Sequence, residues 1–191
     1  MRNRVRSSLF ALVALVLAAA TLAPAHAQGV QGKYSTNELV DSGHRFFGGV
    51  SGGLATLIEK IVEKYGQPNG YILGEEGSGA VVGGLRYGEG TLFTRDAGQH
   101  KVFWQGPSLG WDFGGDGARV MMLVYELPSI DTIYRRYVGV NGSAYAIAGF
   151  GMTVLAADNT YVVPIRAGVG ARLGVNIGYL KFTPRATWNP F

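Results

Sequence analysis

A helical pattern of apolar residues runs from Thr36 to Tyr65, with glycine pairs at 48–49 and 52–53 interrupting it. In its second half, apolar side chains recur at the three- and four-residue spacing that places them on one face of a helix. They are Leu54, Leu57, Ile58, Ile61, Val62 and Tyr65. Charged residues occupy the opposite face, and Gly66 and Pro68 end the pattern. The pattern predicts a helical segment within residues 36–66 that packs through its apolar face on another layer.

After Pro68 the pattern becomes typical of β structure. From Ile165 to Tyr179, apolar residues alternate strictly with glycine or polar residues over 15 positions, which is the two-residue period of a strand. A strand of this length must bend or turn, and its glycines permit both. Small residues on one face also let a sheet curl tightly, as a small barrel requires.

Two other segments, Arg119–Leu127 and Ala144–Val154, are apolar on both faces, which predicts strands that are covered on both sides. A short helical excursion is expected over residues 128–137, and a solvated turn at Glu75 and Glu76. Further strands are predicted at Tyr71–Leu73, Gly79–Tyr87, Thr91–Arg95 and Lys101–Gln105. The chain is therefore predicted to be mainly β: a small soluble β-barrel of about eight antiparallel strands, with the N-terminal helical segment packed on one outer wall. About eight strands give an interior that side chains can just fill.

The first 27 residues have the order expected of a secretory signal peptide. Arginines at positions 2, 4 and 6 precede an apolar stretch from Leu9 to Leu22, and a small-x-small cleavage pattern ends at Ala27. This apolar stretch of about 14 residues is shorter than the roughly 20 that a membrane-spanning helix needs. We therefore predict cleavage between Ala27 and Gln28 and export to the periplasm of a two-membrane bacterium.

The expected organisation is a cleaved signal peptide at 1–27, a flexible leader at 28–35 and a single barrel domain at 36–191, whose helices lie within 36–66. Three of the 17 basic residues and none of the 13 acidic ones lie in the signal, so the formal net charge of +4 falls to +1. This balance gives no support for nucleic-acid binding. Because the chain has no cysteine, it can form no disulfides, and a hydrophobic core must stabilise the domain.

Several short motifs resemble catalytic signatures but lack the required context. Residues 106–110 match G-x-S-x-G, yet no histidine follows Ser108 to complete a hydrolase triad. Residues 112–114 spell the magnesium motif of protein kinases without its partner motifs. Asp112 and Asp116 could bind Ca²⁺, but their spacing is not that of an EF-hand loop, and a structural turn is the favoured interpretation. We expect no enzyme activity, no cofactor and no metal site.

A set of aromatic and basic residues lies around the central predicted strands. Aromatic side chains of this kind usually belong to the core. The alternative is an apolar pocket with an arginine at its rim, suited to a lipid or an envelope glycan. The candidate ligand-binding residues are Arg86, Tyr87, Trp104, Trp111 and Arg119.

Several sequence blocks, in order, resemble the EipA-type envelope-integrity family, and the most distinctive is the block at 104–112. The blocks are NGYILGEE at 69–76, GLRYGEG at 84–90, WQGPSLGWD at 104–112, GSAY at 142–145 and GVGARLG at 168–174. The resemblance covers roughly Phe46 to Phe191. It implies a soluble periplasmic β-barrel needed for cell-envelope integrity, without known catalysis and with a fold distantly similar to the SYLF lipid-binding domain. No binding residues carry over, and a fold analogy alone is a weak argument for lipid binding.

The sequence thus predicts a non-enzymatic periplasmic protein that maintains cell-envelope integrity and envelope stress resistance. A lipid or an envelope glycan is the candidate ligand, peripheral membrane contact is a candidate interaction, and no nucleic-acid partner is expected. The alternative is a small outer-membrane β-barrel, which the chain length and the terminal Phe191 fit. Against it, Pro184 and Pro190 interrupt the last strand, and strands that are apolar on both faces contradict a polar lumen. An enzyme acting on envelope polymers is a third, less favoured hypothesis.

Overall fold

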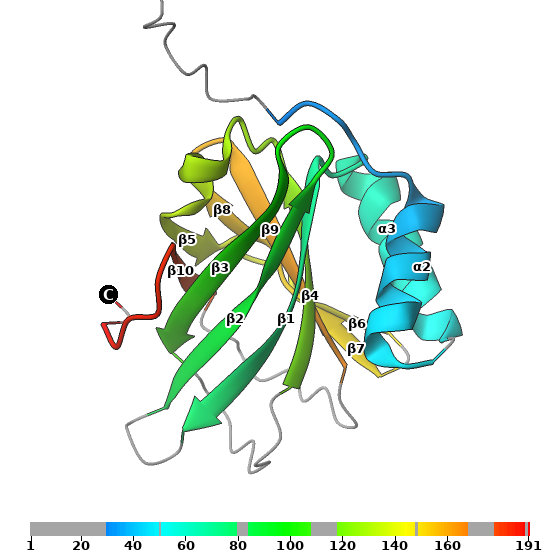
Figure 1. Cartoon of the computed structure of the whole chain (residues 1–191). Coiled ribbons are helices and arrows are strands. Elements are labelled where there is room, and N and C mark those ends of the chain that lie inside the picture. The colour runs from blue at the N-terminus through cyan, green and yellow to red at the C-terminus, as the bar shows by residue number, and fades with distance from the viewer. Residues whose placement is uncertain are drawn as a thin grey trace, which may run out of the picture.

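The computed structural model describes residues 30–49, 51–79, 84–107, 118–147, 149–167, 178–189 and 191. Its strands form one antiparallel sheet that closes on itself (Figure 1). The ring runs β4–β1–β2–β3–β10–β5–β8–β9, and the pairing of β9 with β4 closes it. This arrangement confirms the predicted mainly β fold, a barrel of eight antiparallel strands with helices packed on it.

The strands differ widely in length, and the long ones build the wall that carries the candidate site. Their bounds are β1 Gly70–Gly79, β2 Leu85–Thr94, β3 Gly98–Pro107, β4 Ala118–Tyr125, β5 Arg136–Gly139, β6 Tyr145–Ile147, β7 Phe150–Met152, β8 Leu155–Ala157, β9 Thr160–Ala167 and β10 Tyr179–Thr183. The short hairpin of β6 and β7 extends the sheet from β9. Strand β7 pairs with one end of β9, at residues 165–167, and β8 pairs with the other end, at residues 160–162.

Two helices cover one outer wall of the barrel (Figure 1). Helix α2 spans Thr36–Phe47, and helix α3 spans Gly52–Tyr65. The glycine pairs that interrupt the sequence pattern mark the junction, because Gly48 caps α2 in the left-handed conformation with φ 83°. No helix in the described part of the chain is long and apolar enough to cross a membrane.

Strand β4 separates two hydrophobic cores, which explains why its residues are apolar on both faces. Its even-numbered residues, such as Met122, point into the barrel, while odd-numbered residues, such as Leu123, pack against the helices. The interior core also holds Trp104, Tyr137 and Phe182, all fully or almost fully buried. The prediction that the 119–127 strand is covered on both sides is therefore confirmed.

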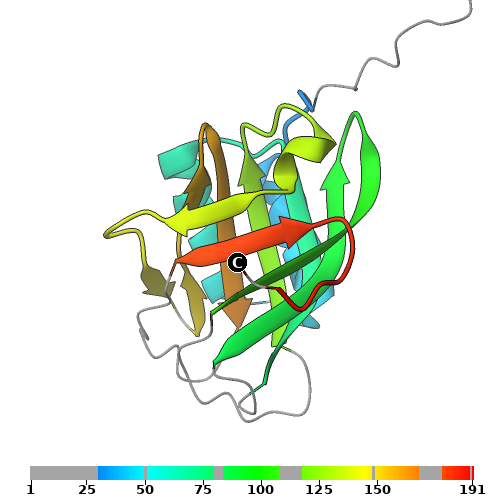
Figure 2. The same cartoon turned by 90° about the vertical axis from the view of Figure 1, so that its left-hand side faces the viewer.

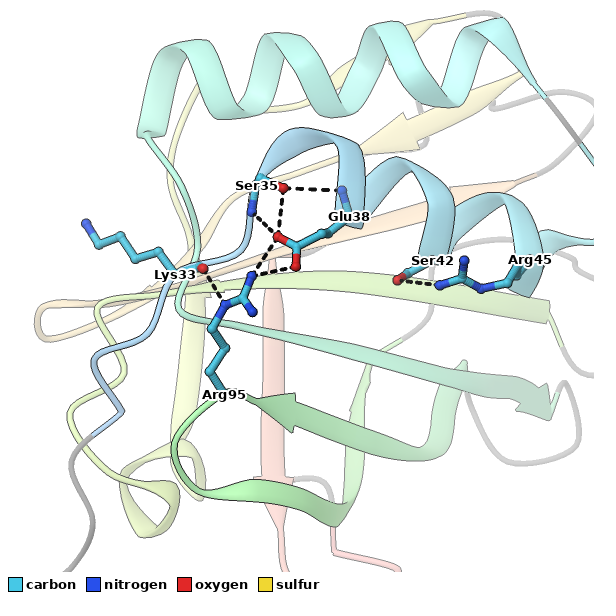
Figure 3. Close-up of polar contacts among 6 residues, drawn as sticks. All are labelled: Lys33, Ser35, Glu38, Ser42, Arg45 and Arg95. Atoms are coloured by element: carbon cyan, nitrogen blue, oxygen red, sulfur yellow. Dashed lines mark hydrogen bonds and ion pairs between the residues drawn. The ribbon is translucent and has the colours of Figure 1, made fainter.

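The segment that precedes α2 is docked on the barrel rather than loose. The predicted leader was 28–35, and within its described part Val30 is buried while the backbone N–H groups of Gln31 and Gly32 donate to Asp96 Oδ2 at 2.8 and 2.6 Å. Figure 3 shows Arg95 reaching from the β2–β3 turn to Glu38 and to the carbonyl of Lys33. These contacts hold the start of the helical layer against the sheet.

Three local predictions were wrong. Glu75 and Glu76 lie inside β1 rather than in a turn, because β1 extends well beyond the short apolar run at 71–73. The strand predicted at Gly79–Tyr87 is instead the end of β1 and the start of β2, with residues 80–83 outside the described chain. The segment 144–154 is a hairpin, and Gly149, with φ 87°, lies at its turn.

Two further predictions meet the structure only in part. The excursion at 128–137 contains a 3-10 turn, η2 at Ile130–Ile133, before β5 begins. Of the alternating stretch Ile165–Tyr179, the structure describes the end of β9 and the start of β10, while residues 168–177 lie outside the described chain.

Candidate functional site

A groove of about 310 Å³ lies on the outer face of β1, β2 and β3, where the C-terminal tail (residues 184–191) passes over the wall. We call it the tail groove. Figure 2 shows the tail, in red, curling back beside β10 and the green strands. The residues that line the groove are Glu75, Glu76, Gly77, Tyr87, Gly88, Glu89, Phe103, Trp104, Gln105, Ala186 and Thr187.

Strand register places the outward-facing groove residues in two rows across three strands. Glu75 lies opposite Glu89, which lies opposite Phe103. In the next row, Tyr87 lies opposite Gln105. Since residues two apart on a strand share a face, both rows face the groove. The wall therefore combines two carboxylates, two aromatic rings and one amide.

A lysine at the edge of the groove contacts its acidic row. Lys101 Nζ lies 3.0 Å from Glu89 Oε1, and the same ammonium lies 5.4 Å from the centroid of the Phe103 ring. All three side chains are at least partly accessible to solvent. An ammonium held by a carboxylate and an aromatic face is thus already present at this site.

Contacts with the barrel wall hold the tail beside the groove. Tyr87 Oη donates to the Trp188 carbonyl at 3.0 Å, and the two rings meet edge to face at 5.4 Å. Lys181 Nζ donates to the backbone oxygens of Asn189 and Phe191 at 3.2 and 2.7 Å. The Trp188 side chain is nevertheless 86% exposed, so the tail presents an aromatic ring to solvent next to the groove.

Beneath the groove, inside the barrel, Glu76 and Arg166 form a largely buried ion pair. Arg166 donates from Nε to Glu76 Oε1 and from Nη2 to Oε2 at 3.2 Å, and Trp104 Nε1 donates to Oε2 at 3.2 Å. Burial raises the pKa of Glu76, but the charge and hydrogen bonds of Arg166 outweigh it and bring the pKa below its ordinary value. Arg86 lowers it further, and its Nε also donates to the Pro107 carbonyl at 2.9 Å.

Glycines on β1 and β2 make room for the Trp104 indole inside the barrel. A Cβ on Gly74 would lie 2.7 Å from Trp104 Cη2, and a Cβ on Gly88 would overlap the indole ring. The indole can lie flat against these strands only because both positions lack a side chain. Gly88 and Trp104 are both among the residues that line the groove.

The structure brings some of the sequence-predicted residues together and separates others. Arg86 and Trp104 both point into the barrel near Glu76, whereas Tyr87 lies on the outer wall of the tail groove. Arg119 lies at the helical layer, where its Nη1 donates to the Phe46 carbonyl at 3.0 Å. Trp111 lies outside the described residues, as do Ser108, Asp112 and Asp116.

The lining surface of the tail groove is mostly apolar, and carboxylates, rather than the expected arginine, stand at its rim. Sequence reasoning missed Glu75, Glu89 and Gln105 as site residues. Alternation along 85–94 already places Tyr87 and Glu89 on one face. The pairing of Glu89 with Glu75 depends on strand register, which a sequence pattern alone does not reveal.

Metal ligation has no support in the described part of the chain, where no group of three or more His, Asp or Glu side chains could hold an ion. The groove's chemistry is that of its own side chains: hydrogen-bond acceptors, an amide and aromatic faces.

The fold and the groove define the class of protein: a closed eight-stranded barrel with two helices on one wall and, on another, a mostly apolar groove with carboxylates at its rim. The chain belongs to the EipA family, described as envelope integrity protein A, whose family model matches residues 32–191. The resemblance of the sequence blocks to that family is thereby confirmed, and the family name points to a role in the cell envelope.

A solved structure supports the same architecture. The chain is similar to a beta-barrel-like, uncharacterized protein from Brucella abortus, with 66% identity, a TM-score of 0.79, and coverage of 83% of this chain and 99% of that one. No curated protein matches the sequence significantly.

Proposed function

We propose that this protein is a non-enzymatic periplasmic factor that maintains cell-envelope integrity, and that it acts by holding an envelope glycan in the tail groove. The family supports the envelope role. The order of basic, apolar and small residues at 1–27 supports export to the periplasm.

The observation that carries the proposal is the composition of the groove. Aromatic faces such as Tyr87 and Phe103 pack against the C–H faces of sugar rings, while carboxylates such as Glu89 hydrogen-bond hydroxyl groups. Gln105 is only 1% exposed, and its Nε2 donates to Thr183 Oγ1 at 3.4 Å, so this amide stabilises the groove wall and does not contact a ligand itself. A small number of fixed polar groups among aromatic side chains is typical of a small-molecule site.

The same observations favour a glycan over a lipid. Large side chains, including Trp104, Tyr137 and Phe182, fill the barrel interior, where an acyl chain would need an apolar cavity. Two carboxylates stand at the groove rim and would repel an anionic phospholipid headgroup. The outer-membrane alternative is also disfavoured, because α2 and α3 cover the outer faces of β4 and β9, which a membrane barrel presents to lipid.

The proposal can be tested on residues 28–191, purified from the periplasm without detergent. Soluble fragments of envelope glycan are titrated into isotope-labelled protein, and amide shifts are followed by NMR. We expect saturable shifts confined to β1–β3 and the tail. Tyr87→Ala should weaken binding at least tenfold, whereas Tyr161→Ala, at an exposed tyrosine on β9, should leave it unchanged.

Three other outcomes would each overturn one part of the proposed function: the glycan ligand, the periplasmic location or the lack of enzyme activity. Co-purified phospholipid with no glycan response would replace the glycan with a lipid. A chain that is obtained only in detergent would favour the outer-membrane barrel. Shortening of the glycan during incubation, detected by mass spectrometry, would show that the protein is an enzyme.

A further inference from the structure

The tail groove contains a pair of like charges that the sheet would be more stable without. Glu75 and Glu89 lie directly opposite each other on β1 and β2. Like charges directly opposite in an antiparallel pair repel and destabilise the pairing. Binding sites commonly keep residues that lower the stability of the fold. A repulsive pair of carboxylates inside a groove therefore points to a binding function.

The chain already shows which group suits these carboxylates. Lys101 Nζ is held by Glu89 at 3.0 Å and lies over the Phe103 ring. On its other side Glu75 lies opposite Arg119 of β4, but the guanidinium of Arg119 donates to the Phe46 carbonyl, and among the ion pairs of the described residues Glu75 takes part in none. The row therefore has room for a second ammonium, which would relieve the repulsion between the two carboxylates.

We propose that the tail groove recognises glycans through a free, protonated amino group, which lies between the carboxylates of Glu75 and Glu89. The sugar ring that bears it packs on Tyr87 and Phe103. This inference rests on the proposed function and narrows its ligand to an amino sugar that is not N-acetylated. Acetylation removes both the charge and the donor geometry of an ammonium, so it abolishes the ion pair with the carboxylates.

Lys101 is then a competitor built into the site. A ligand ammonium must share Glu89 and the Phe103 face with the lysine or displace it. Replacing Lys101 with an uncharged residue should therefore tighten binding of an amine-bearing ligand. A purely structural role for Lys101 would not produce this gain.

The test compares two sugar tetramers on residues 28–191 by isothermal titration calorimetry at low salt: β-1,4-linked glucosamine and its fully N-acetylated form. We expect the glucosamine tetramer to bind at least tenfold more tightly. Glu75→Gln should remove that preference, and Lys101→Met should increase affinity for the glucosamine tetramer several-fold. Glu59→Gln, at an exposed carboxylate on α3, is the matched control and should change neither affinity. All three substitutions are at exposed side chains, so circular dichroism should show unchanged folding.

The outcomes separate this inference from the proposed function. Equal binding of both tetramers, abolished by Tyr87→Ala, would overturn amine recognition and leave glycan binding intact. Binding of neither tetramer would overturn amine recognition, while the titration with envelope fragments still decides glycan binding. Tetralysine that binds as tightly as the glucosamine tetramer would show that the groove selects a cationic peptide instead of a sugar.

Discussion

At the scale of single residues, the packing of Trp104 depends on the absence of a side chain at Gly88. Gly88→Ala would place a methyl group inside the indole, so Trp104 or the strand must shift. We expect the free energy of unfolding to fall by about 1–3 kcal/mol, the usual cost of overpacking. Urea denaturation followed by Trp fluorescence measures it. Gly77→Ala is the control: a Cβ there meets nothing within 4 Å, so stability should change by less than about 0.5 kcal/mol.

The buried pair of Glu76 and Arg166 gives a second prediction at this scale. Glu76→Gln leaves the largely buried Arg166 charge without its counterion, so the free energy of unfolding should fall by at most the roughly 3–5 kcal/mol that breaking a fully buried pair costs. The double variant Glu76→Gln/Arg166→Met removes both charges and should lose less than the single variant. A double variant that is as unstable as Glu76→Gln, or a fully stable Glu76→Gln, would contradict this account.

The lowered pKa of Glu76 also determines how the stability of the fold changes with pH. Because the folded-state pKa lies below the ordinary value of 4.5, the pair stabilises the fold above that value. The contribution is lost as pH falls through the folded-state pKa. The stability of Glu76→Gln should therefore fall less steeply with acidification below about pH 4.5 than that of the native chain.

At the scale of elements, the start of α2 is joined to the barrel by a capping network (Figure 3). Ser35 donates from N and Oγ to Glu38 Oε2 at 2.9 and 2.7 Å, and Arg95 Nη2 donates to Glu38 Oε1 at 2.6 Å. The Ser35 hydrogen bonds, followed by those of Arg95, lower the pKa of Glu38 to about 2. Ser35→Ala should raise this pKa, because it removes the largest cause, and a carboxyl ¹³C NMR titration would detect the change.

The same network determines the pH range in which the attachment of the start of α2 to the barrel should become less stable. Its carboxylate contribution is present above the ordinary pKa of 4.5 and is lost as pH falls toward 2. A Glu38 pKa that is equal in the native chain and in Ser35→Ala would show that the capping box does not form in solution.

The C-terminal tail is a second element whose position depends on few contacts. Lys181 holds two tail carbonyls, so Lys181→Met should release the tail from the wall. We expect faster amide exchange at residues 186–189 and weaker glycan binding, measured by hydrogen–deuterium exchange and calorimetry. Arg185→Met is the control, since it alters an exposed cation within the tail whose side chain makes no hydrogen bond or ion pair with the described residues of the wall, and it should change neither value. Unchanged exchange in Lys181→Met would mean that other contacts hold the tail.

Sequence patterns predicted the helices and strands well where the apolar residues of a segment followed one clear spacing. The α3 face from Leu54 to Tyr65 and the doubly apolar β4 are both present. The patterns failed at Glu75 and Glu76, because two adjacent acids suggest a turn, while in the fold one faces the groove and the other a buried arginine. No local rule reveals that Arg166, 90 residues away, neutralises Glu76.

At the scale of the whole molecule, closure of the sheet decides where a ligand can bind. The pairing of β4 with β9 closes the barrel, aliphatic and aromatic side chains fill its interior, and the helices cover one wall. The proposed binding surface is the adjoining wall, over β1–β3 and beneath the tail. A barrel was predictable from the strand pattern, but this groove was not, because it is built by register between three strands and by a tail that folds back.

The central claim is that ligand lies against the outer wall of β1–β3, and intermolecular NOEs test it most directly. Residues 28–191, with protonated Tyr and Phe rings in a deuterated background, are mixed with the glucosamine tetramer. We predict NOEs from sugar ring protons to the side chains of Tyr87 and Phe103, and their loss in Tyr87→Ala. NOEs to Tyr137 or Phe182, which line the barrel interior, or an absence of NOEs at saturating ligand, would contradict the account.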